Sequence, residues 1–192
     1  MFDYLTKENA PVESLPQIER SLKTYGFLPK LHAVLANAPA AYQAYLDNFA
    51  LFESATSLSP LEQQIVFQTS NYENHCHYCM PGHTYIMKAA GMPEDIIESL
   101  REGKPLSDLK LDALRTFTRQ VIELRGHLSD VQFKAFIAAG YTPCQALEVL
   151  VGLAAKLISN FTNALAHTEL DEPVQQYAWT HPDQRQQQRV EK

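Results

Sequence analysis

The sequence predicts an all-α protein. Three segments begin with Ser or Thr, followed within two residues by Pro and at the third residue by Glu or Gln, which is typical of a capped helix start. These starts lie at Ser14, Ser59 and Thr142. Apolar residues elsewhere recur at helical spacing, as over residues 108–125. No segment alternates apolar and polar residues as a half-buried strand does.

Each expected helix has its own start or stop signal. In chain order the helices are expected at about residues 14–25, 30–36, 40–54, 59–71, 76–90, 93–101, 108–125, 129–139 and 143–166. A glycine follows several of them, in the position that favours a left-handed helix end. The last helix is apolar nearly all round and is therefore expected to be central. Residues 1–172 are expected to form one domain, followed by a polar tail over 173–192 in which His181–Lys192 are expected to be disordered.

Composition narrows the functional classes. The net charge is −6 without a basic patch, which argues against nucleic acid or an anionic membrane as a partner. The N-terminus has no secretory signal pattern, and no apolar run is long enough to span a bilayer. Three cysteines fit a reducing compartment, so the sequence predicts a cytoplasmic protein.

One stretch, residues 71–83, holds two of the three cysteines and three of the seven histidines. Its core pattern is Cys76-x-x-Cys79-x-x-x-His83. If a helix begins near Cys76, these residues fall on one narrow stripe of it, because each residue turns the helix by about 100°. Two thiols and an imidazole on one face indicate redox or metal chemistry.

The stripe suits a dithiol redox cycle. A thiol attacks only as thiolate, and a helix N-terminus or a nearby imidazole lowers its pKa. Cys76 is nearer the expected helix start, whereas Cys79 is one turn from His83, so the residues alone leave open which thiol attacks. The two-residue spacing lets a sulfenic acid on one cysteine condense with the other thiol to a disulfide, which an external dithiol then reduces.

The segment Cys76-His77-Tyr78-Cys79-Met80-Pro81-Gly82-His83, behind a helix that begins at Leu58-Ser59-Pro60-Leu61-Glu62, resembles the core of the AhpD-like alkylhydroperoxidases of the carboxymuconolactone decarboxylase superfamily. This core resemblance covers about residues 40–110. Upstream and downstream segments resemble the peroxidase-related branch, and residues 14–37 would be an N-terminal helical extension.

This resemblance implies an AhpD-like multi-helix orthogonal bundle with the CxxC pair at the N-terminus of a core helix. It implies an antioxidant peroxidase or disulfide oxidoreductase that forms dimers, trimers or hexamers and uses neither metal nor organic cofactor. By position, Cys79 would attack the hydroperoxide, Cys76 would resolve it and meet a thioredoxin- or lipoyl-type reductant, and His83 would relay the proton.

The sequence departs from the family pattern in its proton relay. Family members carry a glutamate twelve residues before the first cysteine, where this chain has Gln64. Glu62 and Glu73 are the nearby carboxylates that would enter a relay in its place, although Glu62 also fits a helix cap. Tyr78 stands where well-known AhpD proteins have a histidine.

Two other functions remain open from the residues. The first is a zinc site of Cys76, Cys79 and His83, with His75 or His77 as the fourth ligand. The second is a non-catalytic oligomeric scaffold.

Several further residues carry weaker signals. Cys144 is expected to be a small buried residue. Glu148, Asn160 and Asn163 are polar residues on the most apolar helix, and a buried Glu148 would need a partner, which makes Glu148 a candidate for the active-site cavity or a subunit interface. The histidines without ligand-like neighbours in the sequence are His32, His127, His167 and His181.

Overall fold

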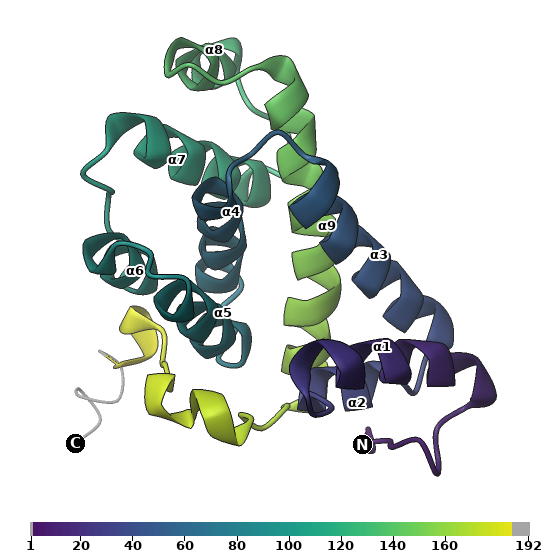
Figure 1. The fold of residues 1–192 in the computed structure, drawn as a ribbon. Coiled ribbons are helices and arrows are strands. Elements are labelled where there is room, and N and C mark those ends of the chain that lie inside the picture. The colour runs from purple at the N-terminus through teal and green to yellow at the C-terminus, as the bar shows by residue number, and fades with distance from the viewer. Residues whose placement is uncertain (1, 186–192) are drawn as a thin grey trace.

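The computed structural model describes residues 2–185, and within that range all regular elements are helical (Figure 1). The elements are η1 (Val12–Ser14), α1 (Leu15–Tyr25), α2 (Lys30–Leu35), α3 (Pro39–Ala55), α4 (Pro60–Glu73), α5 (Cys79–Ala89), α6 (Glu94–Arg101), α7 (Leu109–Glu123), α8 (Asp130–Ala138), α9 (Pro143–Ala166) and η2 (Glu172–Tyr177). The all-α prediction is confirmed. Most predicted helix ends lie within two residues of the observed ones, and the start of α5 differs by three.

Side-chain caps account for the two strongest helix starts. Ser59 and Thr142 each accept a hydrogen bond from the backbone at the third helical position, whose side chain bonds back to the cap. Ser14 differs from its predicted capping role, because its hydroxyl donates to the Ala36 carbonyl at 2.9 Å and no cap bond forms. The hydroxyl therefore ties the start of α1 to the end of α2.

Helix α9 is the central element of the fold. It lies between α3 on one side and α4 on the other, and its C-terminal end reaches α2 (Figure 1). By length and hydropathy α9 could cross a membrane. In this fold 39% of the residues in its most apolar stretch of 18 are buried. Core helices of globular proteins pass the same test, and the fully buried Lys156 faces into this fold.

The buried apolar residues form two clusters. The larger one joins α3 to α9 through Phe52, Phe67 and other side chains of the central helices. The smaller one consists of residues from α1, α2 and α3 together with Cys76, Tyr78 and Cys79. The N-terminal helical extension therefore covers the cysteine motif and shields it from solvent.

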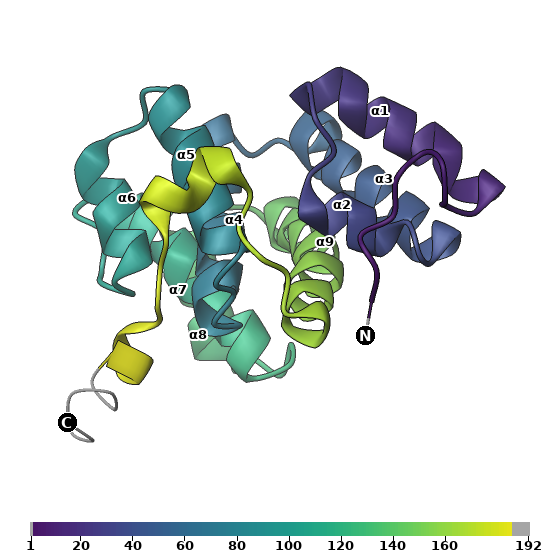
Figure 2. The ribbon, with the colours of Figure 1, turned by 90° about the horizontal axis from the view of Figure 1, so that it is seen from below.

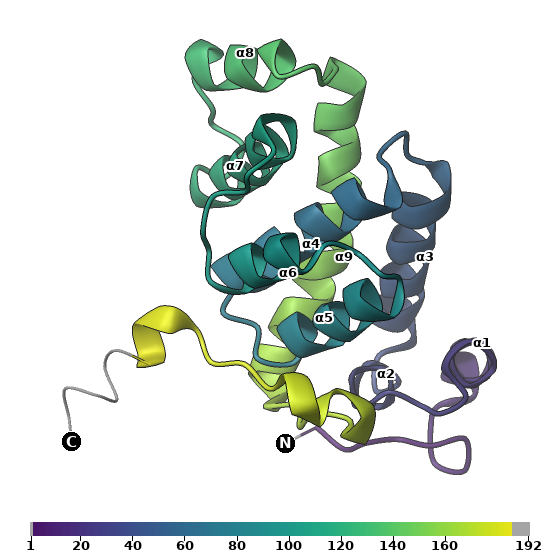
Figure 3. The same cartoon turned by 60° about the vertical axis from the view of Figure 1, so that its left-hand side comes forward.

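The C-terminal segment crosses beneath α5 and α6, as Figures 2 and 3 show. Trp179 and His181 are 8% and 3% exposed, and the indole Nε1 donates to the Arg101 carbonyl at 2.8 Å. The expected disorder is wrong for residues 181–185, because burial of the Trp179 and His181 rings against Tyr72 stabilises the segment. The predicted disorder of residues 186–192 lies outside the described residues.

Two glycines give opposite predictions for the same substitution. A Cβ on Gly152 of α9 would lie 2.8 Å from the ring of the fully buried Phe52, whereas a Cβ on Gly82 of α5 would meet no atom within 4 Å. We expect Gly152→Ala to lower the free energy of unfolding by about 1–2 kcal/mol through overpacking. We expect Gly82→Ala to raise it by about 0.5–1 kcal/mol through helix propensity. Urea denaturation measures both, and equal shifts would contradict the α3–α9 packing.

Candidate active site

The turn between α4 and α5 places the two cysteines in different environments. His75 has a left-handed φ of 50°, and the backbone N–H groups of His75 and Cys76 donate to the carbonyls of Tyr72 and Asn71, both at 2.9 Å. This pattern is a Schellman motif, which ends α4. The backbone N–H of Cys76 bonds to the end of α4, its carbonyl accepts from the Met80 N–H at 3.1 Å, and α5 begins three residues later, at Cys79. The predicted helix start at Cys76 is therefore wrong, and only Cys79 and His83 share a helix.

Both motif thiols are free and buried, at 3% exposure for Cys76 and 4% for Cys79. The Cys79 backbone N–H donates to Cys76 Sγ at 3.3 Å, so Cys76 takes the place of a capping side chain at the start of α5. Cys79 lines a cavity and Cys76 does not. A molecule in this cavity therefore meets Cys79 first.

Helix α9 contributes a polar stripe that faces the thiols. Lys156, Ser159, Asn160 and Asn163 follow helical spacing and are all at most 1% exposed. Asn163 Nδ2 donates to Cys79 Sγ at 3.3 Å. Asn160 instead bonds to polar groups of α4 and the turn that follows it. The sequence marked both asparagines only as polar residues on an apolar helix, and the structure shows that Asn163 donates to the sulfur of Cys79.

Lys156 is the site residue that sequence reasoning missed. Its Nζ lies 3.1 Å from Nε2 of His83 and 5.5 Å from the centre of the Phe67 ring. Within residues 2–185 no carboxylate lies within ion-pair distance of Lys156. A lysine in the middle of a long apolar helix was the available signal, since a lysine is almost never fully buried unless it is paired.

The imidazole of His83 is held in one tautomer. An ammonium group can only donate, so Nε2 accepts from Lys156, and Nδ1–H then donates to Gln64 Oε1 at 2.8 Å. Burial first, and the Lys156 charge second, hold the pKa of His83 well below its ordinary value. His83 is therefore neutral, and the lone pair that a base would use is bonded to Lys156.

The two thiols differ in their acidity. Burial would raise the pKa of Cys79, but the Cys76 thiol and the Lys156 ammonium outweigh it and lower that pKa. The side chains of Ser159 and Asn160 act in the same direction. The bond to Cys79, followed by burial, raises the pKa of Cys76. Cys79 is therefore the more acidic thiol of the pair.

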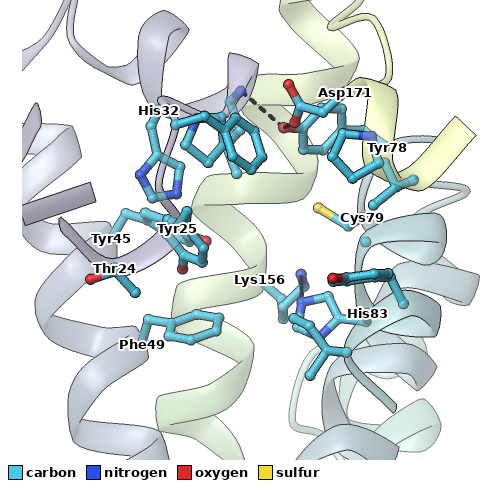
Figure 4. A pocket seen from close by; sticks show the side chains of 18 residues that line it. Thr24, Tyr25, His32, Tyr45, Phe49, Tyr78, Cys79, His83, Lys156 and Asp171 are labelled. Carbon is cyan, nitrogen blue, oxygen red and sulfur yellow. Dashed lines mark hydrogen bonds between the residues drawn. The ribbon is translucent and has the colours of Figure 1, made fainter. Parts of the chain in front are cut away.

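The cavity beside Cys79 has a volume of about 500 Å³ and lies between α1–α3 on one side and α5, α9 and residues 171–174 on the other. Figure 4 shows Cys79, His83 and Lys156 on one side of it and Tyr45 and Phe49 on the other. Most of the lining is aromatic or aliphatic. A pocket of this size suits a small organic molecule.

The two carboxylates considered for a relay lie elsewhere. Glu62 caps α4, accepts from the Tyr141 hydroxyl at 3.0 Å and pairs with Lys110 at 3.5 Å. Glu73 is the last residue of α4, where burial raises its pKa. Neither lines the cavity, whereas Gln64 contacts His83 directly.

Two residues of α9 differ from their expected roles. Cys144 is exposed, which corrects the prediction that it is buried, because the nearby core residues Ala146 and Val149 lie on the other side of α9. Glu148 neither lines the cavity nor lacks a partner, since its carboxylate accepts from the backbone and hydroxyl of Ser57 at 3.0 and 2.8 Å. It joins the α3–α4 loop to α9.

The geometry gives little support to a zinc site. Across residues 2–185 no three His, Cys, Asp or Glu side chains are arranged to hold a metal ion. Both nitrogens of His83 are occupied by Gln64 and Lys156. Of the other possible ligands, His75 stacks on His181 and His77 bonds to the Thr168 carbonyl at 2.8 Å.

Comparison with known proteins gives structural matches only. No family model and no curated protein sequence matches the chain. An uncharacterized peroxidase-related protein with an AhpD core from Ralstonia eutropha JMP134 matches with a TM-score of 0.79 at 17% identity, over 90% of this chain and 93% of that one. A peroxidase-related protein from Silicibacter sp. TM1040 matches with a TM-score of 0.67 at 14% identity, over 83% and 84%.

A third similar structure is that of the debrominase Bmp8, as a cysteine-to-alanine variant in complex with 2,3,4-tribromopyrrole. It matches with a TM-score of 0.73 at 16% identity, over 90% of this chain and 92% of that one. These structures share one helical architecture with the present chain at low sequence identity. The chain therefore has the AhpD-like fold.

Proposed function

We propose that the protein is a thiol-dependent peroxidase that reduces organic hydroperoxides through Cys79. The observation that carries this proposal is that Cys79 lines a cavity together with the buried Lys156, whose charge lowers the pKa of the Cys79 thiol. A low-pKa thiolate with access to a small molecule is what peroxide reduction requires. The similar structures described as peroxidase-related support the same class of reaction.

The first step joins sulfur to oxygen. The Cys79 thiolate attacks the terminal oxygen of ROOH, the O–O bond breaks, and Cys79 becomes a sulfenic acid while the leaving alkoxide takes a proton from Lys156. In this proposal Lys156 is the acid and His83 holds its ammonium in place. Gln64 is sufficient as the partner of His83, because in this step Gln64 only accepts a hydrogen bond from His83 and takes up no proton.

The second step forms the disulfide. The Cys76 thiol condenses with the sulfenic acid of Cys79 and releases water. An external dithiol, of the thioredoxin or lipoyl type, then reduces the disulfide, and its two protons restore the Cys76 thiol and the Lys156 ammonium. Since Cys79 and not Cys76 lines the cavity, a small dithiol reaches the disulfide at Cys79.

Reductive dehalogenation is the second candidate. It is favoured by the largely apolar, aromatic lining of the cavity beside Cys79 and by the similar debrominase structure with bound 2,3,4-tribromopyrrole. In such a reaction the two thiols supply two electrons, and the products are the C–H compound, the disulfide and hydrogen bromide. Both reactions would leave the same Cys76–Cys79 disulfide for a dithiol to reduce.

We further propose a cytoplasmic homo-oligomer. The dithiol cycle needs a reducing compartment. Helix α9 exposes an apolar stripe on the side away from Lys156, with exposed fractions of 46% to 71%. The stripe consists of Leu147, Leu150, Leu157, Phe161 and Leu165. A contiguous apolar strip on the longest helix suits a contact with a second copy of the chain.

The cysteine variants separate the roles of the three thiols. We expect Cys79→Ser to lose turnover with cumene hydroperoxide and a dithiol, because the attacking sulfur is gone. We expect Cys76→Ser to react once and stop at a sulfenic acid, which dimedone labelling and mass spectrometry detect. Cys144→Ser is the control and should keep the wild-type rate, since Cys144 is exposed and outside the cavity.

A comparison of the two substrates decides between the two reactions, and the cysteine variants test the dithiol mechanism that both reactions share. Bromide release from 2,3,4-tribromopyrrole without turnover of hydroperoxide would favour dehalogenation. Wild-type rates in both Cys79→Ser and Cys76→Ser would disprove a dithiol mechanism for either substrate.

Lys156→Met tests the cation beside the thiolate. Since Lys156 lowers the pKa of Cys79, its removal should raise that pKa, so the alkylation rate of Cys79 should begin to fall at a higher pH than in the wild type. We also expect peroxidase kcat/KM at pH 7 to fall by about a hundredfold or more, because the proton donor is lost. Iodoacetamide labelling read by mass spectrometry gives the pH profile. The exposed Lys134→Met is the control, and an unchanged profile in Lys156→Met would contradict the proposed role.

The α9 stripe predicts the state of association. We expect the wild type to be a dimer, trimer or hexamer at micromolar concentration in light scattering after size exclusion. Leu157→Lys combined with Phe161→Lys should reduce the mass toward the monomer, because charges replace apolar contact area. Leu109→Lys, at an exposed site on α7, is the control. A monomeric wild type would contradict the proposed interface.

A further inference from the structure

The cavity wall across from Cys79 contains two buried polar side chains. His32 of α2 and Tyr45 of α3 are 3% and 6% exposed, and both line the cavity. Their rings meet edge to face, with centroids 5.5 Å apart. Figure 4 shows them on the opposite side of the cavity from Cys79 and Lys156. The wall is otherwise mostly aromatic or aliphatic, so these two side chains are its distinctive polar feature.

His32 is held in place through one of its two ring nitrogens. Its Nδ1 lies 2.6 Å from the Ser21 hydroxyl and 3.1 Å from the Tyr42 hydroxyl. The Ser21 hydroxyl is itself within bonding distance of the Gln17 carbonyl, at 3.0 Å, and of Tyr42, at 2.6 Å. The ring orientation is therefore set by a network behind the wall, which leaves Nε2 available to the cavity.

Two buried side chains of this wall each keep one polar atom without a hydrogen-bonding partner within residues 2–185. His32 is bonded only through Nδ1, which leaves Nε2, and the Tyr45 hydroxyl is the other atom. The Tyr25 hydroxyl on the same wall also lacks a partner among these residues, but Tyr25 is 42% exposed to solvent. Buried polar groups are normally hydrogen-bonded, so two unused ones on one wall of a cavity indicate a place where a ligand supplies the partner.

The charge state of the wall limits the kind of ligand. Burial lowers the pKa of His32 to about 3 and raises that of Tyr45 well above its ordinary value, so both are neutral at physiological pH. Asp171 also lines the cavity and would repel an anion, while the cation Lys156 lies on the Cys79 side. This wall therefore favours an uncharged hydrogen-bonding group.

We propose that His32 and Tyr45 recognise a neutral hydroxyl or N–H group at one end of an apolar, aromatic-sized substrate whose other end reaches Cys79. The proposal rests on the proposed function for the reaction at Cys79. The expected substrates are uncharged aryl compounds with a polar group distant from the reacting atom. A carboxylate fits this wall less well because it carries a charge. Hydrogen peroxide fits less well because it is too small to contact this wall and Cys79 at the same time.

Binding of unreactive alcohols tests the wall apart from the chemistry. The probes are phenyl-substituted tertiary alcohols with none, one or two methylene groups between ring and alcohol carbon, each with and without a para-hydroxyl group. Isothermal titration of the wild type should show about five- to tenfold tighter binding of at least one para-hydroxyl compound than of its parent, the gain typical of about one neutral hydrogen bond. A para-carboxylate analogue should bind more weakly than the parent.

The variants assign that gain to the two side chains. Tyr45→Phe and His32→Phe should each bring the ratio of the two Kd values toward one, with little change for the parent alcohol. Tyr45→Phe removes only a hydroxyl, so it keeps the test decisive if His32→Phe does not fold, as judged by circular dichroism. Tyr72→Phe, outside the cavity, is the matched control and should keep the wild-type ratio.

The outcomes separate this inference from the proposed function. Ratios near one in the wild type, or ratios unchanged by Tyr45→Phe, would overturn the role of the wall even if hydroperoxides turn over. If the wild type prefers the para-hydroxyl compound and Tyr45→Phe abolishes that preference, recognition of the hydroxyl by this wall is supported even if no hydroperoxide is reduced. In that case only the peroxidase proposal would fail.

Discussion

The burial of the Lys156 charge is the constraint on which the site depends. An unpaired charge in a protein interior costs several kcal/mol, and Lys156 is 1% exposed with no carboxylate partner among residues 2–185. The lone pair of His83 and the face of Phe67 offset part of this cost. The Lys156 charge also lowers the pKa of the Cys79 thiol, so ionisation of Cys79 would stabilise the buried ammonium further. The same ammonium fixes the tautomer of His83, which in turn makes Gln64 a suitable partner.

The surrounding helices make this charge pair effective. Helices α1–α3 cover the cysteine motif, and exclusion of water strengthens the attraction between Lys156 and Cys79. The left-handed turn at His75 places Cys76 behind Cys79, out of the cavity. The fold thereby places the two thiols in different environments, because Cys79 lines the cavity and Cys76 lies outside it.

Much of the fold could be predicted because its signals are local. The capping pattern at Ser59 and Thr142 and the glycines after several helices depend on residues three or four positions apart, and the helices appear close to their expected ends. The start of α5 is the main exception. His75 is not glycine, so its left-handed conformation and the Schellman bonds through Cys76 had no clear signal in the sequence.

The sequence by itself determined the all-helical class, the nearness of Cys76 and Cys79, and the placement of His83 one turn after Cys79. Only the tertiary structure decided the charge of each group. Lys156 and His83 are separated by 73 positions, and His32 reaches the same cavity from a helix that precedes both cysteines. Periodicity shows which face of a helix is buried, but the pKa of a buried side chain depends on which distant groups pack against it.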